Sequence, residues 1–264
     1  MNFDSPPTWR LPDGVDPSLW RYTHTPRLAT EEDDYFAGHP LFARDAEVVA
    51  QRFFRTGALI DLGCGAGRHS VQFAHRGFAV TAVDLSLPML EVVAAKARQA
   101  GVTANLACVQ ANLCRLGCFP SGSFDYALSM FSTLGMIRGR DARRRALAEA
   151  CRVLKPGGRL ALHAHNVWLN LDNPHGRRWL LGQLAQRLLG RSGFGDRKMT
   201  YRGVAGMEVH LYRWSELADD LQSGGFQIDE VIPIHAITAA TIPAPWLLPR
   251  FRAGGWLIFA HRPA

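Results

Sequence analysis

The stretch Ala58-Leu59-Ile60-Asp61-Leu62-Gly63-Cys64-Gly65-Ala66-Gly67-Arg68-His69-Ser70 decides the fold of this chain. Its first five residues form a short apolar run bounded by glycine, which predicts a buried strand. The glycines Gly63, Gly65 and Gly67 then form a turn without bulky side chains. Backbone N–H groups can therefore approach a ligand closely there, and a helix can begin near Arg68.

An acidic residue ends the next apolar run, which covers 78–83. Asp84 comes 19 residues after Gly65, where a carboxylate can accept hydrogen bonds from both hydroxyls of a ribose held over the turn. Dinucleotide-binding turns need another glycine three residues after the second one, and this chain has Arg68 there. The Gly-x-Gly-x-Gly spacing therefore argues against a dinucleotide ligand.

Length and composition are those of an ordinary globular protein. The chain has 264 residues, of which 47% are hydrophobic and 20% charged, so one domain with embellishments is expected. The formal net charge of +7 is compatible with nucleic acid or an anionic membrane surface, but it concerns association and solubility rather than fold.

Cysteine usage and hydropathy indicate a cytoplasmic protein. The five cysteines are an odd number without paired C-x-x-C spacing, so they are expected to be free thiols in a reducing compartment. No His or acid cluster joins Cys114 and Cys118, and no metal site is expected. The first 20 residues lack an apolar signal-peptide core, and no run of about 18 apolar residues predicts a membrane span.

Strand and helix patterns alternate through most of the chain. Strands are expected over 57–62, 78–83, 104–109, 124–130, 159–165, 226–234 and 256–260, and helices over 42–55, 67–76, 86–100, 141–154 and 216–223. This alternation predicts a doubly wound α/β fold with a mostly parallel sheet and right-handed crossovers. Ligands of such sheets bind at the carboxyl ends of the strands.

From about residue 56 to 165 the chain resembles the class I (Rossmann-like) S-adenosylmethionine-dependent methyltransferases. The resemblance rests on the glycine turn and on four further motifs, 83–86 (Val-Asp-Leu-Ser), 110–113 (Gln-Ala-Asn-Leu), 123–127 (Ser-Phe-Asp-Tyr-Ala) and 154–158 (Leu-Lys-Pro-Gly-Gly). It implies a seven-stranded, mostly parallel sheet whose last strand is antiparallel. It also implies S-adenosyl-L-methionine as cofactor and S-adenosyl-L-homocysteine as product.

The resemblance further implies which residues bind the cofactor. Asp84 would hold the ribose, and the side-chain oxygen of Asn112 would accept from the adenine amine. Met130 would contribute an apolar wall. The full expected set is Asp61, Gly63, Cys64, Gly65, Gly67, Asp84, Leu85, Ala111, Asn112, Leu113 and Met130.

Few side chains are needed for the chemistry, because a sulfonium methyl group is already activated and alignment supplies most of the acceleration. A base is required only where the acceptor must lose a proton early. His163 and His165 alternate onto one face of the strand at 159–165. His165 is the candidate catalytic base, with a packed histidine as the equal alternative, whereas His163 is expected to be packed or hydrogen-bonded. His210 is expected either to face an acceptor or to be exposed.

Residues outside the family pattern are expected to recognise the acceptor. Residues 1–40 look irregular, and 41–264 form the methyltransferase domain with an insertion at 167–214. The insertion contains a basic helix candidate from Arg177 to Arg191, with one apolar side formed by Leu180, Leu181, Leu184 and Leu188, and a β-hairpin candidate over 198–212. Alternation in the hairpin predicts that Met207, Val209 and Leu211 are buried, and that Glu208, His210 and Tyr212 form a polar face. We expect the insertion to cover the acceptor side.

The sequence favours metal-independent methyl transfer to nitrogen or oxygen of a small organic molecule. The Asn-Pro-Pro-Tyr and Pro-Cys motifs of nucleic-acid base methylation do not follow the strand at 124–130. Two alternatives stay open. One is an RNA methyltransferase of the modified wobble-uridine type, which the arginines at 143–145 and in the insertion would serve. The other is a non-catalytic domain that binds S-adenosylmethionine and regulates a partner.

Overall fold

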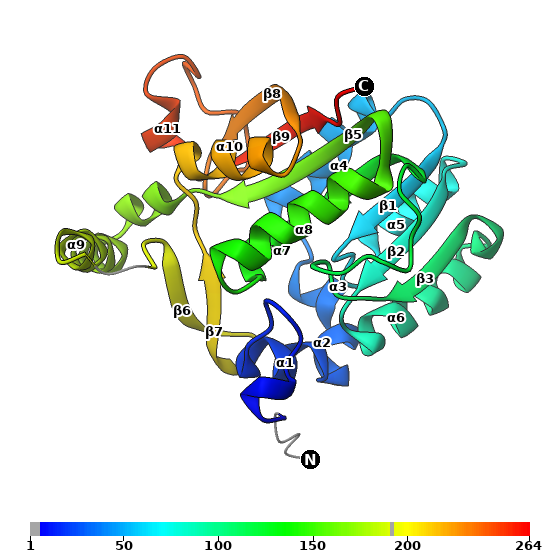
Figure 1. Cartoon of the computed structure of the whole chain (residues 1–264), viewed down its shortest axis with the longest axis horizontal. Coiled ribbons are helices and arrows are strands. Elements are labelled where there is room, and N and C mark those ends of the chain that lie inside the picture. The colour runs from blue at the N-terminus through cyan, green and yellow to red at the C-terminus, as the bar shows by residue number, and fades with distance from the viewer. Residues whose placement is uncertain (1–5, 191–192) are drawn as a thin grey trace.

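A seven-stranded sheet forms the centre of the computed structural model, which describes residues 6–190 and 193–264 (Figure 1). Its strand order is β3-β2-β1-β4-β5-β9-β8. The strands are β1 (Ala58–Leu62), β2 (Ala79–Asp84), β3 (Leu106–Gln110), β4 (Phe124–Ser129), β5 (Leu154–His165), β8 (Gln227–Ile234) and β9 (Gly255–His261).

The pairing confirms the expected topology. Five neighbouring strands, β3, β2, β1, β4 and β5, pair in parallel in that order. The last strand, β9, lies between β5 and β8 and is antiparallel to both. The strand order reverses between the hydrogen-bonded neighbours β1 and β4, because the chain returns from β3, at one edge of the sheet, to place β4 on the other side of β1. Ligands of doubly wound sheets bind outside the carboxyl ends of the strands at such a switch point.

Helices cover both faces of the sheet (Figure 1). One buried cluster joins the sheet to α8 (Arg140–Val153) and α10 (Trp214–Ser223), and it includes Leu147, Leu217 and Trp256. The other joins it to α4 (Pro40–Arg52), α5 (Arg68–His75) and α6 (Leu87–Gln99), and it includes Phe53 and Phe73. Short helical turns connect these elements at η2 (Thr103–Asn105), α7 (Thr133–Met136) and α11 (Pro249–Arg252).

The N-terminal segment is helical, so the expectation that 1–40 is irregular is wrong for its described part. It contains η1 (Thr8–Arg10), α1 (Pro17–Thr23), α2 (Pro26–Thr30) and α3 (Glu32–Tyr35). Pro17, Pro26 and Pro40 suggested loops, but each occupies the first position of a helix. A proline fits there because the first helical N–H groups have no partner within the helix.

The insertion forms η3 (Val167–Asp172), α9 (Pro174–Leu188) and a separate hairpin of β6 (Asp196–Tyr201) and β7 (Val204–His210). The hairpin is confirmed, but the apolar side expected for the helix is only half right, because Leu180 and Leu184 pack in a buried cluster and the other two leucines do not. Leu180 is buried, whereas Leu181 and Leu188 are 66% and 89% exposed. The helix lies at the edge of the molecule (Figure 1), and its buried side packs on η3, on Val209 of β7 and on Leu211, which follows that strand. Arg191 lies outside the described residues.

The polar face expected for the hairpin is also wrong. Met207 and Leu211 are buried as expected, but His210 and Tyr212 are buried as well. Their side of the strand faces Glu216 of α10 and Arg143 of α8, so both sides of β7 have neighbours near its end.

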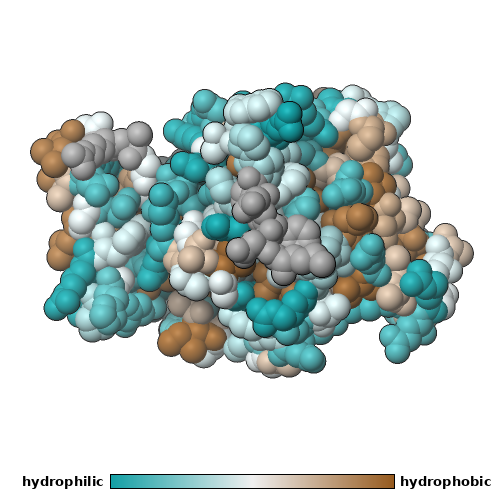
Figure 2. All heavy atoms as spheres, turned by 90° about the horizontal axis from the view of Figure 1, so that it is seen from below, coloured by the Kyte–Doolittle hydropathy of each residue, from teal (hydrophilic) through white to brown (hydrophobic). Residues whose placement is uncertain are grey.

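Hydrophobic residues on the face seen in Figure 2 occur in separate groups among hydrophilic ones. One group lies at the left end, where α9 lies in Figure 1 and where Leu188 and Leu189 are exposed. Within 6–190 and 193–264, no helix combines the length and the apolar character needed to cross a bilayer.

Candidate functional site

The glycine turn after β1 makes a cradle that side chains would fill. Gly63, Gly65 and Gly67 have φ angles of 75°, 53° and 79°, in the left-handed region that favours glycine. A Cβ on Gly67 would lie 2.7 Å from Cγ2 of Val93, and one on Gly63 would overlap Thr133. The turn therefore leaves no room for side chains at these positions, and Val93 and Thr133 pack directly on its backbone.

Asp84, at the end of β2, is held by this turn. Its two carboxylate oxygens accept hydrogen bonds from the backbone N–H groups of Gly65 (3.0 Å) and Ser86 (2.8 Å). Burial raises the pKa of Asp84, and these two amides oppose that shift. Each oxygen keeps lone pairs free, so the carboxylate is fixed in place and can still accept from a ligand's hydroxyl groups.

A first cavity lies over the turn, at the carboxyl ends of β1, β2 and β4. Nine of the eleven expected cofactor residues line it, namely Asp61, Gly63, Cys64, Gly65, Asp84, Leu85, Asn112, Leu113 and Met130. The other two lie behind the lining. Gly67 is the N-cap residue of α5, and Ala111 packs against the buried cluster under the sheet.

The side chain of Asn112 is already engaged. Its Oδ1 accepts from the backbone N–H of Cys114 (2.9 Å), and its Nδ2 donates to the carbonyl of Asp13 (2.9 Å). The oxygen keeps one lone pair, so it can still accept from an adenine amine. The contact to Asp13 ties the N-terminal segment to this end of the cavity.

N-terminal residues that the sequence analysis did not assign to the site also line the first cavity, including Leu19, Tyr22 and Glu32. Glu32 accepts a hydrogen bond from the N–H of Ala66 in the glycine turn (2.9 Å). The prolines at helix N-termini could have indicated ordered helices here, but nothing in the sequence connects them to a turn some thirty residues away.

The tip of the β6–β7 hairpin reaches the same place. The Arg202 guanidinium lies 3.6 Å from the Glu32 carboxylate and 4.7 Å from the centre of the Tyr35 ring. Burial raises the pKa of Glu32, whereas Arg202 lowers it. The N-terminal helices and the hairpin thus meet above the glycine turn.

A second cavity of about 500 Å³ adjoins the first. The two share the lining residues Phe36, Phe131, Met136 and Tyr201, so they meet at these aromatic and apolar side chains. Phe131 and the next residue, Ser132, have φ angles of 51° and 62°, which are uncommon for side chains with a Cβ. Strained backbone of this kind clusters at functional sites, and here it lies where the two cavities meet.

Both histidines of β5 face the second cavity. Their rings are 4.8 Å apart, and His163 is fully buried. Burial holds the pKa of His163 well below its usual range and lowers that of His165 to about 4. The expectation that His163 is a packed or hydrogen-bonded residue is only half right, because neither of its ring nitrogens has a hydrogen-bond partner.

His210 lines neither cavity. It is buried between Asp196 (2.7 Å) and Glu216 (3.0 Å), and Glu216 lies 3.7 Å from Arg143. Burial opposes the charged imidazole, but the two carboxylates outweigh it and raise the pKa of His210. This network fastens the end of the hairpin to α8 and α10.

The raised pKa of His210 predicts pH-dependent stability. A pKa raised on folding adds stability below the unfolded value of about 6.5, and this is lost as pH rises through the folded value. The destabilisation caused by His210→Gln should therefore be larger at pH 6 than at pH 9 in urea unfolding. His261→Asn serves as control, because it removes a histidine that is paired with Asp229 in a more exposed position. Equal destabilisation by His210→Gln at both pH values would contradict the assignment.

Among residues 6–190 and 193–264, no group of three His, Cys, Asp or Glu side chains is arranged to hold a metal ion. All five cysteines are free thiols. Burial raises the pKa of the Cys64 thiol, which lies at the glycine turn, well above its usual value. Cys64 is therefore a neutral group of the cavity wall.

Known proteins resemble both the sequence and the fold. A family model described as a methyltransferase domain matches residues 59–158. The ubiquinone/menaquinone biosynthesis C-methyltransferase of Psychromonas ingrahamii is 36% identical over 105 residues, 39% of this chain and 40% of that protein. The malonyl-[acyl-carrier protein] O-methyltransferase of Salmonella typhimurium is 39% identical over 127 residues, 44% of this chain and 45% of that protein. The chain thus spans less than half the length of these relatives.

A solved structure extends the likeness in fold. The 1,6-didemethyltoxoflavin-N1-methyltransferase of Burkholderia thailandensis, with its substrate and S-adenosylhomocysteine bound, has a TM-score of 0.61 and 18% identity. The alignment covers 90% of this chain and 85% of that one. The motif-bearing residues, the strand order and these matches agree: residues 59–158 are a methyltransferase domain, and the chain has the fold of the class I S-adenosylmethionine-dependent methyltransferases.

Proposed function

We propose that this chain transfers a methyl group from S-adenosylmethionine to a small organic molecule held in the second cavity. The observation that carries the proposal is the adjacency of the two cavities. One contains the glycine turn and Asp84, the other contains histidines and apolar walls, and they meet at Phe131. A donor in the first cavity would therefore present its reactive group toward an acceptor in the second.

The first cavity fits the cofactor. Asp84 would accept from the ribose hydroxyls, Gly63 and Gly65 would contact the cofactor through their backbone, and Leu113 and Met130 would provide apolar contact. When bound, S-adenosylmethionine supplies an activated methyl group on a positively charged sulfur. The protein's task is to hold the acceptor in line and to exclude water, which Phe36, Phe131 and Tyr201 favour.

The insertion supports a role as acceptor-side cover. Leu169, Arg197, Met199, Val209 and Leu211, all within 167–214, line the second cavity. The acceptor atom under this proposal is nitrogen or oxygen, and the transfer needs no metal. A regulatory domain without catalysis would have no need for a second cavity of this size beside the cofactor site.

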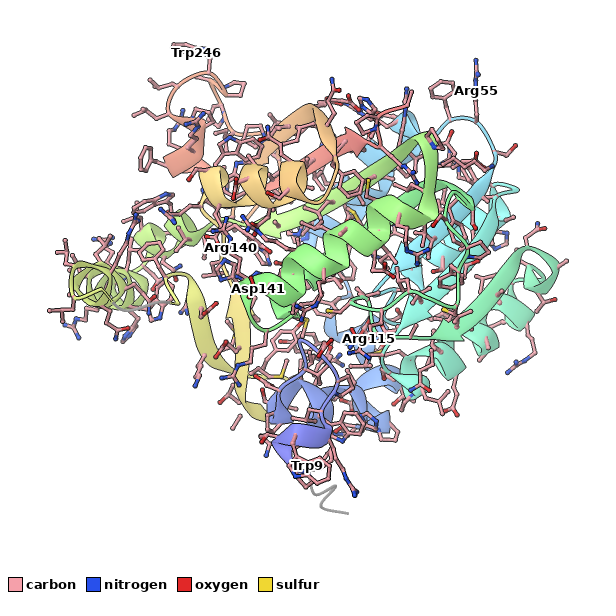
Figure 3. The ribbon with its side chains drawn as sticks, viewed as in Figure 1. Trp9, Arg55, Arg115, Arg140, Asp141 and Trp246 are labelled. Atoms are coloured by element: carbon pink, nitrogen blue, oxygen red, sulfur yellow. The ribbon has the colours of Figure 1, made fainter. Side chains whose placement is uncertain are left out.

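Two of the three arginines at 143–145 are paired with carboxylates of α10. Arg144 binds Asp219 (2.5 Å) and Asp220 (2.7 Å) of α10, and its neighbour Arg140, at the start of α8, binds the same pair (Figure 3). Arg143 is buried against Glu216. These guanidinium groups hold two helices together, so they are not free to neutralise phosphates.

The exposed arginines of α9 allow a direct test against RNA. Replacing both Arg178 and Arg187 with Gln should leave the dissociation constant for S-adenosylmethionine within a factor of about two, because neither lines the cofactor cavity. Gel shifts against bulk transfer RNA at several salt concentrations give the comparison. For each protein, the logarithm of the association constant is plotted against the logarithm of the salt concentration. Tight binding by the wild type, with a slope that becomes shallower by about one unit for each arginine removed in the variant, would favour RNA as the substrate.

Turnover is the primary test of the proposal. The protein is incubated with S-adenosylmethionine and a pool of small aromatic and aliphatic acceptors, and formation of S-adenosylhomocysteine is measured. A product that forms in the presence of a chelator supports metal-independent transfer. Cofactor binding without turnover on any pool would favour the regulatory alternative.

A further inference from the structure

We propose that the second cavity selects planar acceptors that carry an acidic hydroxyl group, rejects cationic amines, and uses His165 to remove the hydroxyl proton. This inference deepens the proposed function and rests on it. Under this inference the atom that receives the methyl group is oxygen rather than nitrogen, and the two histidines of β5 each have a role.

The walls of the cavity suit a flat ring. Phe36 and Phe131 lie edge-to-face with their centres 4.9 Å apart, and Phe131 lies nearly parallel to His163 at 6.5 Å. Leu41, Met199 and Leu211 add apolar surface. Aromatic side chains bind other rings by stacked or edge-on contact, which flexible aliphatic chains do not exploit.

The charge of the cavity favours an acidic group over an amine. Its polar lining consists of His39, His163, His165, His235 and Arg197, together with the hydroxyl groups of Ser132, Tyr35 and Tyr201. No Asp or Glu is among the described residues that line it. An alkylammonium ion would lie near the Arg197 guanidinium without a carboxylate partner, and an unpaired charge removed from water is costly.

Neighbouring side chains hold the Arg197 guanidinium in place. Its Nη1 donates to Oδ1 of Asn170, and its guanidinium lies 5.7 Å from the centre of the Trp179 ring. It therefore contributes a fixed positive charge at the cavity. That charge favours a hydroxyl group that is ionised or about to ionise.

The histidines can take a proton. Both ring nitrogens of His163 lack a hydrogen-bond partner although the residue is fully buried, and unpaired buried groups of this kind indicate a missing ligand. His165 lies one step closer to the end of β5 and is less deeply buried. Both rings are neutral near pH 7, so a lone pair is available.

The proton and the bonds balance in this scheme. The acceptor O–H proton moves to a ring nitrogen of His165 and the new O–CH₃ bond forms, while the bond between that methyl carbon and the sulfonium sulfur breaks. The products are a methyl ether, neutral S-adenosylhomocysteine and a protonated imidazole, which releases its proton to water. His163 is a positioning residue, because its ring packs edge-on against His165 at 4.8 Å.

Two probes of matched shape test the selectivity. Binding of 2-naphthol and of 2-(aminomethyl)naphthalene, which is cationic at pH 7.5, is measured by calorimetry with S-adenosylhomocysteine present. We expect the naphthol to bind at least about tenfold more tightly, with His163→Asn reducing its affinity. Equal or tighter binding of the amine overturns the inference. Failure of S-adenosylhomocysteine itself to bind would instead overturn the proposed function.

The pH profile of naphthol methylation tests the base. In the wild type the rate should be flat from pH 6 to 9, because burial keeps the His165 ring neutral over this range. The titratable and charged groups that line the cavity with it are His39, His163, His235, Arg197, Tyr35 and Tyr201, and none of them is a carboxylate that would favour the charged imidazole. In His165→Asn the rate should rise about tenfold per pH unit toward the ionisation of the phenol near pH 10. His261→Asn, on β9 and outside both cavities, should keep the wild-type profile. A flat profile in His165→Asn overturns its role as base.

Discussion

Replacing Asp84 with alanine should weaken S-adenosylmethionine binding by about 1–3 kcal/mol, or roughly 5- to 150-fold. The carboxylate is the group expected to pair with the ribose hydroxyls, and without it they would be buried unpaired. The variant also loses the two acceptors that hold the N–H groups of Gly65 and Ser86. Calorimetric titration of wild type and variant with S-adenosylmethionine measures the difference.

Asp125 provides a matched control for this experiment. It also accepts a hydrogen bond from a backbone N–H, that of Ala58 (2.9 Å), and it also lies in a strand of the parallel sheet. It lies beside the beginning of β1, however, at the opposite edge from the cavity. Asp125→Ala should lower stability without changing affinity. Equal affinities for wild type and Asp84→Ala would remove Asp84 from the cofactor site.

The sheet was predictable because local patterns determine it. Strands β1, β2 and β4 are short apolar runs that end just before Gly63, at Asp84 and at Ser129, and Ser86 caps α6 by accepting from the N–H of Met89. These patterns act over a few residues, so they can be read along the chain. The number of strands and the antiparallel last strand were implied by the family resemblance rather than by the patterns, and the strand order came from the structure.

The cover over the site was not predictable in the same way. Glu32 reaches the glycine turn and Arg202 reaches Glu32, but the three elements are far apart in the sequence. The burial of His210 likewise depends on Asp196, Glu216 and Arg143, which come from three other elements. Charged residues paired across such distances look the same in a sequence as solvated ones.

The histidines of β5 show the same limit within the site. Alternation correctly placed His163 and His165 on one face of the strand. Whether a strand histidine is packed, bonded or facing a cavity depends on what lies opposite, here Phe131, whose ring lies near both histidine rings. The depth of His163 in the strand suggested packing, and only the neighbouring elements show that its nitrogens are unpaired.

Replacing Arg202 with methionine should destabilise the protein by about 3 kcal/mol at pH 8, because it leaves the buried Glu32 carboxylate without its positive partner. The Arg202 side chain is 2% exposed and that of Glu32 16% exposed. Urea unfolding of Arg202→Met gives the magnitude. The exposed ion pair between Arg27 of α2 and Glu31, which follows that helix, serves as control. Arg27→Met should lower the free energy of unfolding by well under about 1 kcal/mol.

The pH dependence of the destabilisation caused by Arg202→Met shows whether Arg202 acts through its charge or through its packing. Burial already raises the pKa of Glu32, and without Arg202 it should rise further. A carboxyl group whose pKa is raised on folding destabilises the protein increasingly as pH rises from the unfolded value, near 4.5, through the folded one. The Arg202→Met penalty should therefore be small at pH 5 and large at pH 8, and Glu32→Gln should remove most of it. A penalty that is equal at both pH values and survives Glu32→Gln would mean that Arg202 acts through its packing on Tyr35, and that the hairpin is not held over the glycine turn by charge.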